Sequence, residues 1–526
     1  MQIFSFKLIQ KLLFIIFIFF GLLSAKDYNI SYDELEYRQQ GFIVLNHLGK
    51  KFFPEKTNQI IKNKNLDYTD LDNYFINDNN HFKVHHTFLA TLEYIFHKNS
   101  SKSVVFNFRH AINFIFSSLL IILLYKLLRF NFNRSSSSIG IILFILSPRI
   151  YANFFFNPND IMSMLSLVGS LFYLFRIIKK NKTVDYILFS IFIVFSFNIR
   201  FTNLYIYPLL IFSLLYISNF RLLSFPYKKF LLHIISAIIL LYLITPNLWI
   251  EPNPIHLLKG FLSQVNFTAH DPAIMFLGSN ISSSDVPFYY LLLWIIISSP
   301  VFVLILFFVG MLIYIRKLIL NDLYKSFKEN IYGILIFYFI FTPIFGYIIF
   351  KPEIFNGWRH FYFIYIGIIF FSTYTIQEIQ NKKNIYINLA FIVLFSLNTV
   401  FILNWSFKNH PYQNLFFNSL SKKYANNFEL DYWGLSNLEA LNYLLDKEKG
   451  KIYVSQYNDR SRIDFSYLMI NKNDQKRIEL NTENSKYWIS NINSGLRDKD
   501  YENLGYKVVH KIFVDNFTIN RILTKK

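Results

Sequence analysis

Long apolar runs without charges recur along the whole chain, and they constrain its fold more than any other feature. Each run is close to the length of about twenty residues that an α-helix needs to cross a bilayer. Only 16% of the 526 residues are charged, whereas soluble proteins carry about 25%. The sequence therefore predicts a polytopic α-helical membrane protein.

The apolar runs predict about eleven transmembrane helices. The first run has a basic start and a small-residue end, as in a signal peptide, but its length favours an uncleaved helix. The expected spans are residues 7–25, 111–128, 137–153, 161–178, 184–200, 203–219, 230–248, 288–315, 331–350, 360–377 and 385–405.

The basic residues indicate how these spans are oriented. A net charge of +20 would suit a nucleic-acid binder, but the Lys and Arg residues stand in short clusters between apolar runs. Loops rich in basic residues, such as 176–182, alternate with loops that are poor in them, such as 247–287. By the positive-inside rule the N-terminus is cytoplasmic and the C-terminus periplasmic, as expected for a multi-pass protein of a bacterial inner membrane. We expect no nucleic-acid partner.

Two hydrophilic pieces fall on the periplasmic side of this topology. The first is the loop 26–108, and the second is the tail 406–526, in which short β-like runs alternate with helical ones. We therefore expect a transmembrane domain over 1–405 and a small periplasmic α/β domain over 406–526. The chain has no cysteine, which excludes disulfides and thiolate chemistry. It has no Walker or GxGxxG sequence, so a nucleotide site is not expected.

Three carboxylates are candidate catalytic residues. Asp33 and Glu34 follow the first apolar run closely, so they are held near the membrane surface, where a lipid head group would arrive. A carboxylate there can take a proton from an incoming hydroxyl. Asp160 follows Asn157-Pro158-Asn159 in a short loop on the same side. The alternatives are that Asp33 and Glu34 are solvent-exposed loop residues, and that Asp160 caps the start of an ordinary helix. Two carboxylates beside a phosphate could also hold a divalent cation.

Basic side chains gather at the same edge of the membrane. Arg109, Arg200, Arg359 and His360 all stand near the outer ends of predicted spans. A single arginine at a helix end usually snorkels to the interface. Several of them on the outer side run against the positive-inside bias, and the planar guanidinium suits phosphate.

Three further residues are weaker candidates for substrate contact. His85 and His86 are adjacent in the first loop, and Asp271 precedes a proline before the eighth span. In a strand the two histidines would point to opposite faces, which argues against a shared metal. A plain turn explains Asp271 equally well.

The order of these motifs resembles the C-type membrane glycosyltransferases, and most of all the family 39 group. That group includes protein O-mannosyltransferases and bacterial enzymes that decorate lipid A. The resemblance extends over about residues 27–440. Two positions depart from the expected pattern: Asn159 stands where a lysine is expected, and His85-His86 stands where Tyr-Gly or His-Pro is expected. The segments that carry the likeness are 32–34, 147–149, 156–160, 359–360, 410–418 and 428–434.

This resemblance implies a chemistry and a set of partners. A sugar linked to a polyprenyl phosphate would enter from the membrane, and a lipid, glycan or protein hydroxyl would attack its anomeric carbon with inversion. Asp33 would be the general base. Arg200, Arg359 or His360 would meet the charge of the departing phosphate. The competing interpretations are a secondary transporter and a lipid-fed polysaccharide polymerase or ligase, which would use the same kind of helical scaffold.

Overall fold

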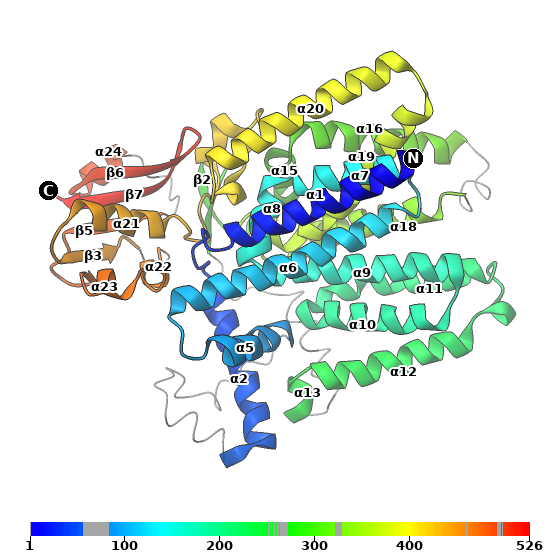
Figure 1. Cartoon of the computed structure of the whole chain (residues 1–526), viewed down its shortest axis with the longest axis horizontal. Coiled ribbons are helices and arrows are strands. Elements are labelled where there is room, and N and C mark those ends of the chain that lie inside the picture. Colours follow the sequence, from blue (N-terminus) through cyan, green and yellow to red (C-terminus); the bar gives the residue numbers. More distant parts are fainter. Residues whose placement is uncertain are drawn as a thin grey trace.

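The computed structural model is a bundle of long helices with a small α/β unit at one end (Figure 1). It describes residues 2–55, 84–250, 272–320, 329–458, 461–491 and 498–526, together with the single residues 253, 255, 259, 262 and 496. The bundle and the elements inserted in it are α1 (Gln2–Ser24), α2 (Glu34–Phe52), α5 (Val84–His97), α6 (Lys102–Leu128), α7 (Arg134–Ile145), α8 (Pro148–Phe156), α9 (Pro158–Lys180), α10 (Thr183–Ile199), η1 (Phe201–Ile206), α11 (Tyr207–Ile217), η2 (Leu222–Ser224), α12 (Tyr227–Ile244), α13 (Asn247–Ile250), β1 (Ala273–Phe276), β2 (Ser279–Ser282), α15 (Tyr290–Ser298), α16 (Val301–Leu320), α18 (Ile331–Phe350), η3 (Arg359–Ile364), α19 (Tyr365–Asn381) and α20 (Ile385–Lys408).

The helices are those of a multi-pass membrane protein. Among the described residues, seven helices are long and apolar enough to cross a membrane, or eight if the bent pair α7 and α8 counts as one span. Residues 10–24, α10 and the pair η1 and α11 are shorter apolar helices. Each of the eleven expected spans overlaps one of the helices of the bundle. The count of eleven crossings stays a prediction.

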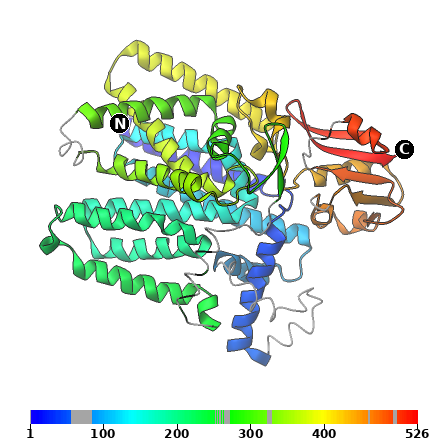
Figure 2. The same ribbon diagram turned by 180° about the vertical axis from the view of Figure 1, so that it is seen from behind.

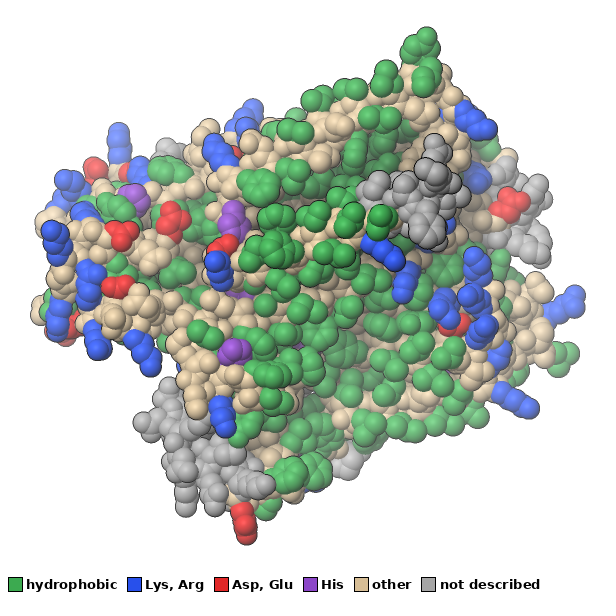
Figure 3. Space-filling view, viewed as in Figure 1, with side chains coloured by type: hydrophobic (Ala, Val, Ile, Leu, Met, Phe, Trp, Pro, Cys, Tyr) green, Lys and Arg blue, Asp and Glu red, His purple; other side chains and the backbone are tan. Residues whose placement is uncertain are grey.

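The surface of the bundle has the polarity that a bilayer requires. Figure 3 shows an apolar band across the helices, with Lys and Arg side chains gathered beyond its two ends. Outward-facing residues of this band include Leu231, Ile235 and Ile239 on α12, each about half exposed. A soluble protein would hide such a surface, whereas lipid tails solvate it.

α9 is the central helix, and its sequence explains its place. Asn157 caps its first turn by accepting a hydrogen bond from the Asp160 amide, and Pro158 occupies the first helical position, where no backbone donor is needed. Along its length Ser163, Ser166 and Ser170 are buried. Small residues at this spacing let neighbouring helices approach closely. A Cβ at Gly169 would lie 2.1 Å from the ring of Phe192.

The third expected span, 137–153, is not one continuous helix. α7 ends at Ile145, α8 begins at Pro148, and the two are bent by 67°. Proline lacks the amide hydrogen that would continue the helix, and its ring clashes with the preceding turn. Ser147 at the bend hydrogen-bonds to Tyr365 at 2.5 Å. After the bend, α8 leads directly to Asn157 and to Asp160 in the first turn of α9.

The first loop contributes two packed helices, α2 and α5. Both views show α2 running across the direction of the long helices (Figure 1 and Figure 2). The two helices pack closely at Gly41, where a Cβ would lie 2.2 Å from the carbonyl oxygen of His86. This contact fixes α5 against the first half of α2, the helix that begins directly after Asp33.

The last part of the chain forms the α/β unit. Its sheet has the order β4-β3-β5-β7-β6. Strand β3 is parallel to both β4 and β5. Strand β7 is antiparallel to both β5 and β6. The hydrophobic core runs without a break from the bundle into this unit. The elements are η4 (Gln413–Leu415), η5 (Lys422–Asn427), α21 (Asn437–Lys447), β3 (Ile452–Gln456), α22 (Ile463–Tyr467), α23 (Lys472–Gln475), β4 (Ile478–Leu480), β5 (Tyr487–Ser490), α24 (Asp498–Asn503), β6 (Tyr506–Val514) and β7 (Phe517–Lys525).

Candidate active site

Asp33 lies directly against Arg359, although the two are far apart in the sequence. Asp33 stands at the start of α2, and Arg359 is the first residue of η3. The Nη1 atom of Arg359 donates to Oδ2 of Asp33 at 2.6 Å. The side chain of Asp33 keeps 17% of its exposure and that of Arg359 keeps 7%. The pair is therefore largely shielded from water but still reachable by a ligand.

Asp160 and Arg200 form a second pair of the same kind. Asp160 lies in the first turn of α9, and Arg200 follows the last residue of α10 with an extended backbone. Nη2 of Arg200 donates to Oδ1 of Asp160, and the side-chain amide of Asn157 donates to Oδ2 at 2.8 Å. The N-cap of α9 is thus Asn157, which leaves the carboxylate of Asp160 available for Arg200.

Tyr37 connects the two pairs. Its hydroxyl donates to Oδ2 of Asp33 at 3.1 Å and accepts from the side-chain amide of Asn159 at 3.2 Å. Burial, and then the charge of Asp33, raise the pKa of Tyr37 well above its usual value, so the hydroxyl keeps its proton. We call Asp33, Tyr37, Asp160, Arg200 and Arg359 the paired-charge cluster. Tyr37 was not predicted from the sequence, although a residue four positions after Asp33 falls on the same face of a helix.

Glu34, the neighbour of Asp33, points elsewhere. It is 3% exposed, its carboxylate accepts from the Ser31 amide at 2.8 Å, and it faces Nε2 of His110 at 3.0 Å. Nδ1 of His110 lies 3.2 Å from the carbonyl of Ala25. Successive residues of a helix are turned by about 100°, so two adjacent acids do not share one site. Glu34 anchors the first loop to α6, and a catalytic role for it stays a prediction.

Arg109 is not brought to the paired-charge cluster. Its Nη1 atom lies 3.1 Å from Glu93 on α5, and Arg38 on α2 binds the same carboxylate at 2.5 Å. All three side chains are nearly fully buried. The described contacts of Arg109 are therefore those of a buried ion network between α2, α5 and α6, and phosphate binding by Arg109 stays a prediction.

The two histidines lie in a helix rather than in a strand. His85 and His86 are the second and third residues of α5, and their rings are 3.8 Å apart. The ring of His86 stacks on that of Tyr37 at 4.5 Å, so this histidine borders the paired-charge cluster. Asp271 lies outside the described residues. Within the described part of the chain, no three His, Asp or Glu side chains are grouped as metal ligands.

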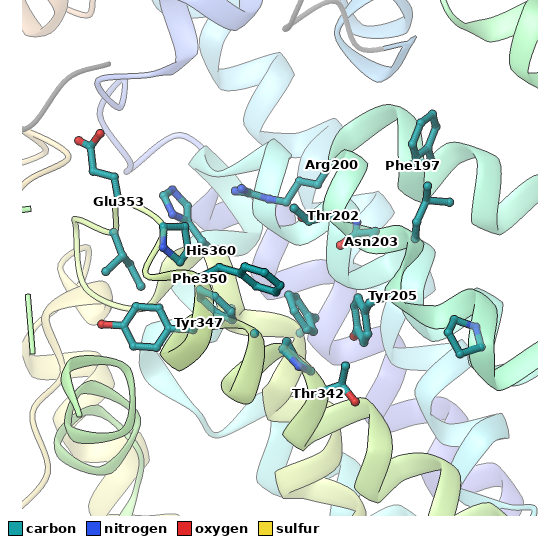
Figure 4. Close-up of a pocket in the computed structure, with 18 residues that line it drawn as sticks. Phe197, Arg200, Thr202, Asn203, Tyr205, Thr342, Tyr347, Phe350, Glu353 and His360 are labelled. Carbon is teal, nitrogen blue, oxygen red and sulfur yellow. The ribbon is translucent and has the colours of Figure 1, made fainter. Parts of the chain in front are cut away.

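A cavity of about 750 Å³ opens beside the paired-charge cluster. Its wall comes from the end of α10, η1, the second half of α18 and the loop that leads into η3. Arg200, His360 and Glu353 lie toward one end of it, and Thr342 lies toward the other (Figure 4). Most of the remaining lining is apolar, including Phe197, Leu204, Pro208, Phe350 and Phe363.

Arg200, which lines this cavity, has one guanidinium donor without a described partner. Its Nε atom is buried and has no hydrogen-bond partner among the described residues, and the same is true of Nε of Arg359. The ring of Trp433 also contacts Arg359, with the guanidinium carbon 4.6 Å from the ring centre. Buried donors without acceptors are costly. Arg200 at the edge of an apolar cavity, with Arg359 in the neighbouring ion pair, is therefore suited to receive an anion.

Part of the chain matches the model of a known protein family. The family model described as dolichyl-phosphate-mannose-protein mannosyltransferase matches residues 84–250. The resemblance to protein mannosyltransferases is confirmed. The matched segment supplies Asp160 and Arg200 of the paired-charge cluster, whereas Asp33, Tyr37 and Arg359 come from outside it. The chain thus carries, within a multi-pass membrane protein, a segment that resembles a family of glycosyltransferases.

No curated protein matches the chain. Among solved structures, the crystal structure of the Archaeoglobus fulgidus oligosaccharyltransferase in the apo form is similar with a TM-score of 0.41 and 12% sequence identity. That match covers 79% of this chain and 62% of the other, so the chain corresponds to less than two thirds of that protein.

Proposed function

We propose that the protein transfers a sugar from a polyprenyl-phosphate-linked donor to a hydroxyl acceptor, with inversion, at the periplasmic edge of an inner membrane. The acceptor is a lipid, a glycan or a protein. One observation carries the proposal: two carboxylates and two arginines from four separate elements form two ion pairs, and Arg200 of one pair lines an apolar cavity. Placing ionisable groups together within a membrane protein costs free energy, and such groups therefore tend to mark functional sites.

Asp33 is the general base of this proposal. Both of its described side-chain hydrogen bonds, from Tyr37 and Arg359, go to Oδ2. Oδ1 is therefore left for the acceptor hydroxyl. An acceptor must come within about 3 Å of that oxygen for proton transfer, and the 17% exposure of the side chain leaves room for this approach.

Arg200 and His360 receive the donor's phosphate. Both line the cavity, and Nε of Arg200 is without a described partner. In the ligand-free protein Asp160 and Asp33 neutralise the two arginines, and an entering phosphate adds acceptors to them. When the sugar leaves, the charge on the phosphate increases from −1 to −2, and fixed cations in a dry site stabilise that increase.

The reaction balances as one displacement. The acceptor oxygen forms a bond to the anomeric carbon, its proton passes to Asp33, and the bond from that carbon to the phosphate oxygen breaks. The polyprenyl phosphate departs with both electrons of the broken bond. Attack from the side opposite the phosphate inverts the anomeric carbon. The apolar wall, with Phe350 and Phe363 among its residues, suits the isoprenoid chain.

Asp33→Asn tests the proposal directly. The substitution keeps the size of the side chain but removes the proton acceptor, so we expect sugar transfer to be abolished while membrane insertion and abundance stay normal. The readout is mass analysis of envelope glycolipids and glycoproteins in cells with wild-type protein, without the protein and with the variant. Asp27→Asn is the matched control, because Asp27 lies in the same loop but pairs with His410 at 2.9 Å.

Two results would count against the proposal. Normal transfer by Asp33→Asn would remove Asp33 from the role of base. An envelope whose glycolipids and glycoproteins are identical with and without the protein would remove the transferase function itself.

A further inference from the structure

Glu353 is a buried carboxylate with one oxygen unused. It lies in the loop between α18 and η3, lines the cavity together with Arg200 and His360, and is 6% exposed. Its Oε1 atom accepts from the Ser283 hydroxyl at 2.8 Å. Its Oε2 atom is buried and accepts no hydrogen bond from any described residue.

The loop that carries Glu353 is held in an unusual conformation. Lys351, Asn356 and Gly357 all have positive φ angles, of 45°, 60° and 68°. Non-glycine residues adopt such angles at a cost, and they persist where the surroundings impose them. Ser283 fixes the loop at Glu353, and Glu429 accepts from the Gly357 amide at 3.3 Å. The position of the carboxylate at the cavity is therefore set by its surroundings.

Two polar groups of the cavity lining, both toward the same end (Figure 4), require different hydrogen-bond partners. Nε of Arg200 is a donor and requires an acceptor, whereas Oε2 of Glu353 is an acceptor and requires a donor. A phosphate satisfies the arginine but is repelled by the carboxylate. A sugar offers hydroxyl donors, so a sugar joined to a phosphate satisfies both groups at once.

We propose that Glu353 recognises the donor by accepting a hydrogen bond from a hydroxyl group of its sugar. This inference rests on the proposed function, because it assigns the sugar end of the same donor. A site built to hydrogen-bond a hydroxyl strongly rejects a ligand that lacks it. Glu353 therefore makes the protein prefer the glycosylated polyprenyl phosphate over the bare polyprenyl phosphate that remains after transfer.

The test compares the lipids that co-purify with the protein from its own cells. Wild-type protein, Glu353→Gln and Glu353→Asp are purified in mild detergent, and their bound polyprenyl lipids are quantified by mass spectrometry. We expect the ratio of glycosylated to bare polyprenyl phosphate to fall about tenfold or more in both variants, the change expected for loss of one hydrogen bond to a charged group. Glu353→Asp keeps the charge and withdraws the carboxylate by one methylene, so it tests position even if Glu353→Gln folds poorly.

Glu429→Gln is the matched control. Glu429 also touches this loop, but it does not line the cavity, and its substitution is expected to leave the ratio unchanged. An unchanged ratio in both Glu353 variants would overturn the inference while leaving the proposed function standing. Wild-type protein that carries no polyprenyl lipid at all would overturn the proposed function, and the inference with it.

Discussion

Glu93 holds two arginines inside the protein, and its replacement by glutamine should destabilise the fold strongly. The Glu93 side chain is 4% exposed, and those of Arg38 and Arg109 are 6% and 2% exposed. Its carboxylate accepts from Nε of Arg38 at 2.9 Å and from Nη1 of Arg109 at 3.1 Å. Glutamine preserves the shape but not the charge, so two buried cations lose their common counter-ion. Removing one partner of a buried ion pair costs about 3–5 kcal/mol.

This free energy corresponds to a measurable shift in thermal unfolding. With an unfolding entropy of about 2.1 cal/mol/K per residue, a chain of 526 residues has about 1.1 kcal/mol/K, and the unfolding temperature falls by about 3–5 °C. Intrinsic fluorescence of the purified protein in detergent during heating measures this shift. Glu36→Gln is the control, because Glu36 is an exposed acid of α2, and such surface changes alter stability by about 0.5 kcal/mol or less.

The same network separates two roles for Arg109. In Arg109→Met, Arg38 still neutralises Glu93, so we expect a small shift in unfolding temperature and unchanged sugar transfer. Loss of transfer at an unchanged unfolding temperature would instead support the phosphate-binding role that the sequence suggested. If Glu93→Gln unfolds at the wild-type temperature, the reasoning from the buried network is refuted.

Three further predictions concern other parts of the molecule. In Tyr37→Phe, Asp33 loses a donor and the Asn159 amide loses an acceptor, so transfer should fall about tenfold or more with little change in abundance; wild-type transfer rates would exclude Tyr37 from the site. Burial raises the pKa of Asp431 to about 7. Between about pH 4 and pH 7 its carboxyl is therefore neutral in the folded protein but ionised in the unfolded chain. The stabilisation of the fold by Asp431 is present below about pH 4 and is lost as the pH rises through about 7, a change of about 4 kcal/mol in the free energy of unfolding. The unfolding temperature should therefore fall more between pH 5 and pH 8 in wild type than in Asp431→Asn, and equal slopes would contradict this. A reporter that is active only in the periplasm should be active at Lys526 and inactive at Lys180, and the reverse pattern would invert the topology.

The sequence predicted best what depends on local chemistry. Apolar length placed each expected span on a helix, because a bilayer selects for uncharged runs whatever their partners are. Asn157 and Pro158 marked the start of α9 in the same local way. The bend at Ser147 and Pro148 also had a local signal, because a proline inside an apolar run interrupts its helix, but the run 137–153 was predicted as one span.

The pairing of charges lay beyond a local interpretation of the sequence. Asp33 and Arg359 are 326 positions apart, and only their common depth in the predicted topology suggested that they meet. Nothing in the sequence distinguished Arg359, which pairs with Asp33, from Arg109, which pairs with Glu93. Glu93 itself attracted no attention, because a single acid in a helical stretch has no signature of burial. The paired-charge cluster was thus anticipated in four of its five members, and its partners were assigned only by the structure.

The chain segment around Trp433 joins two distant parts of the molecule. The Tyr32 amide donates to the Trp433 carbonyl at 3.1 Å, and the Asn29 side chain donates to the Gly434 carbonyl at 3.1 Å. The indole of Trp433 also lies against Arg359. A chain cut after residue 405 would therefore lose contacts to two parts of the site. The residues that precede Asp33 would lose their hydrogen bonds to Trp433 and Gly434, and the Arg359 guanidinium would lose its contact with the indole. The two halves of such a divided protein should restore sugar transfer only when they are produced together and reassemble.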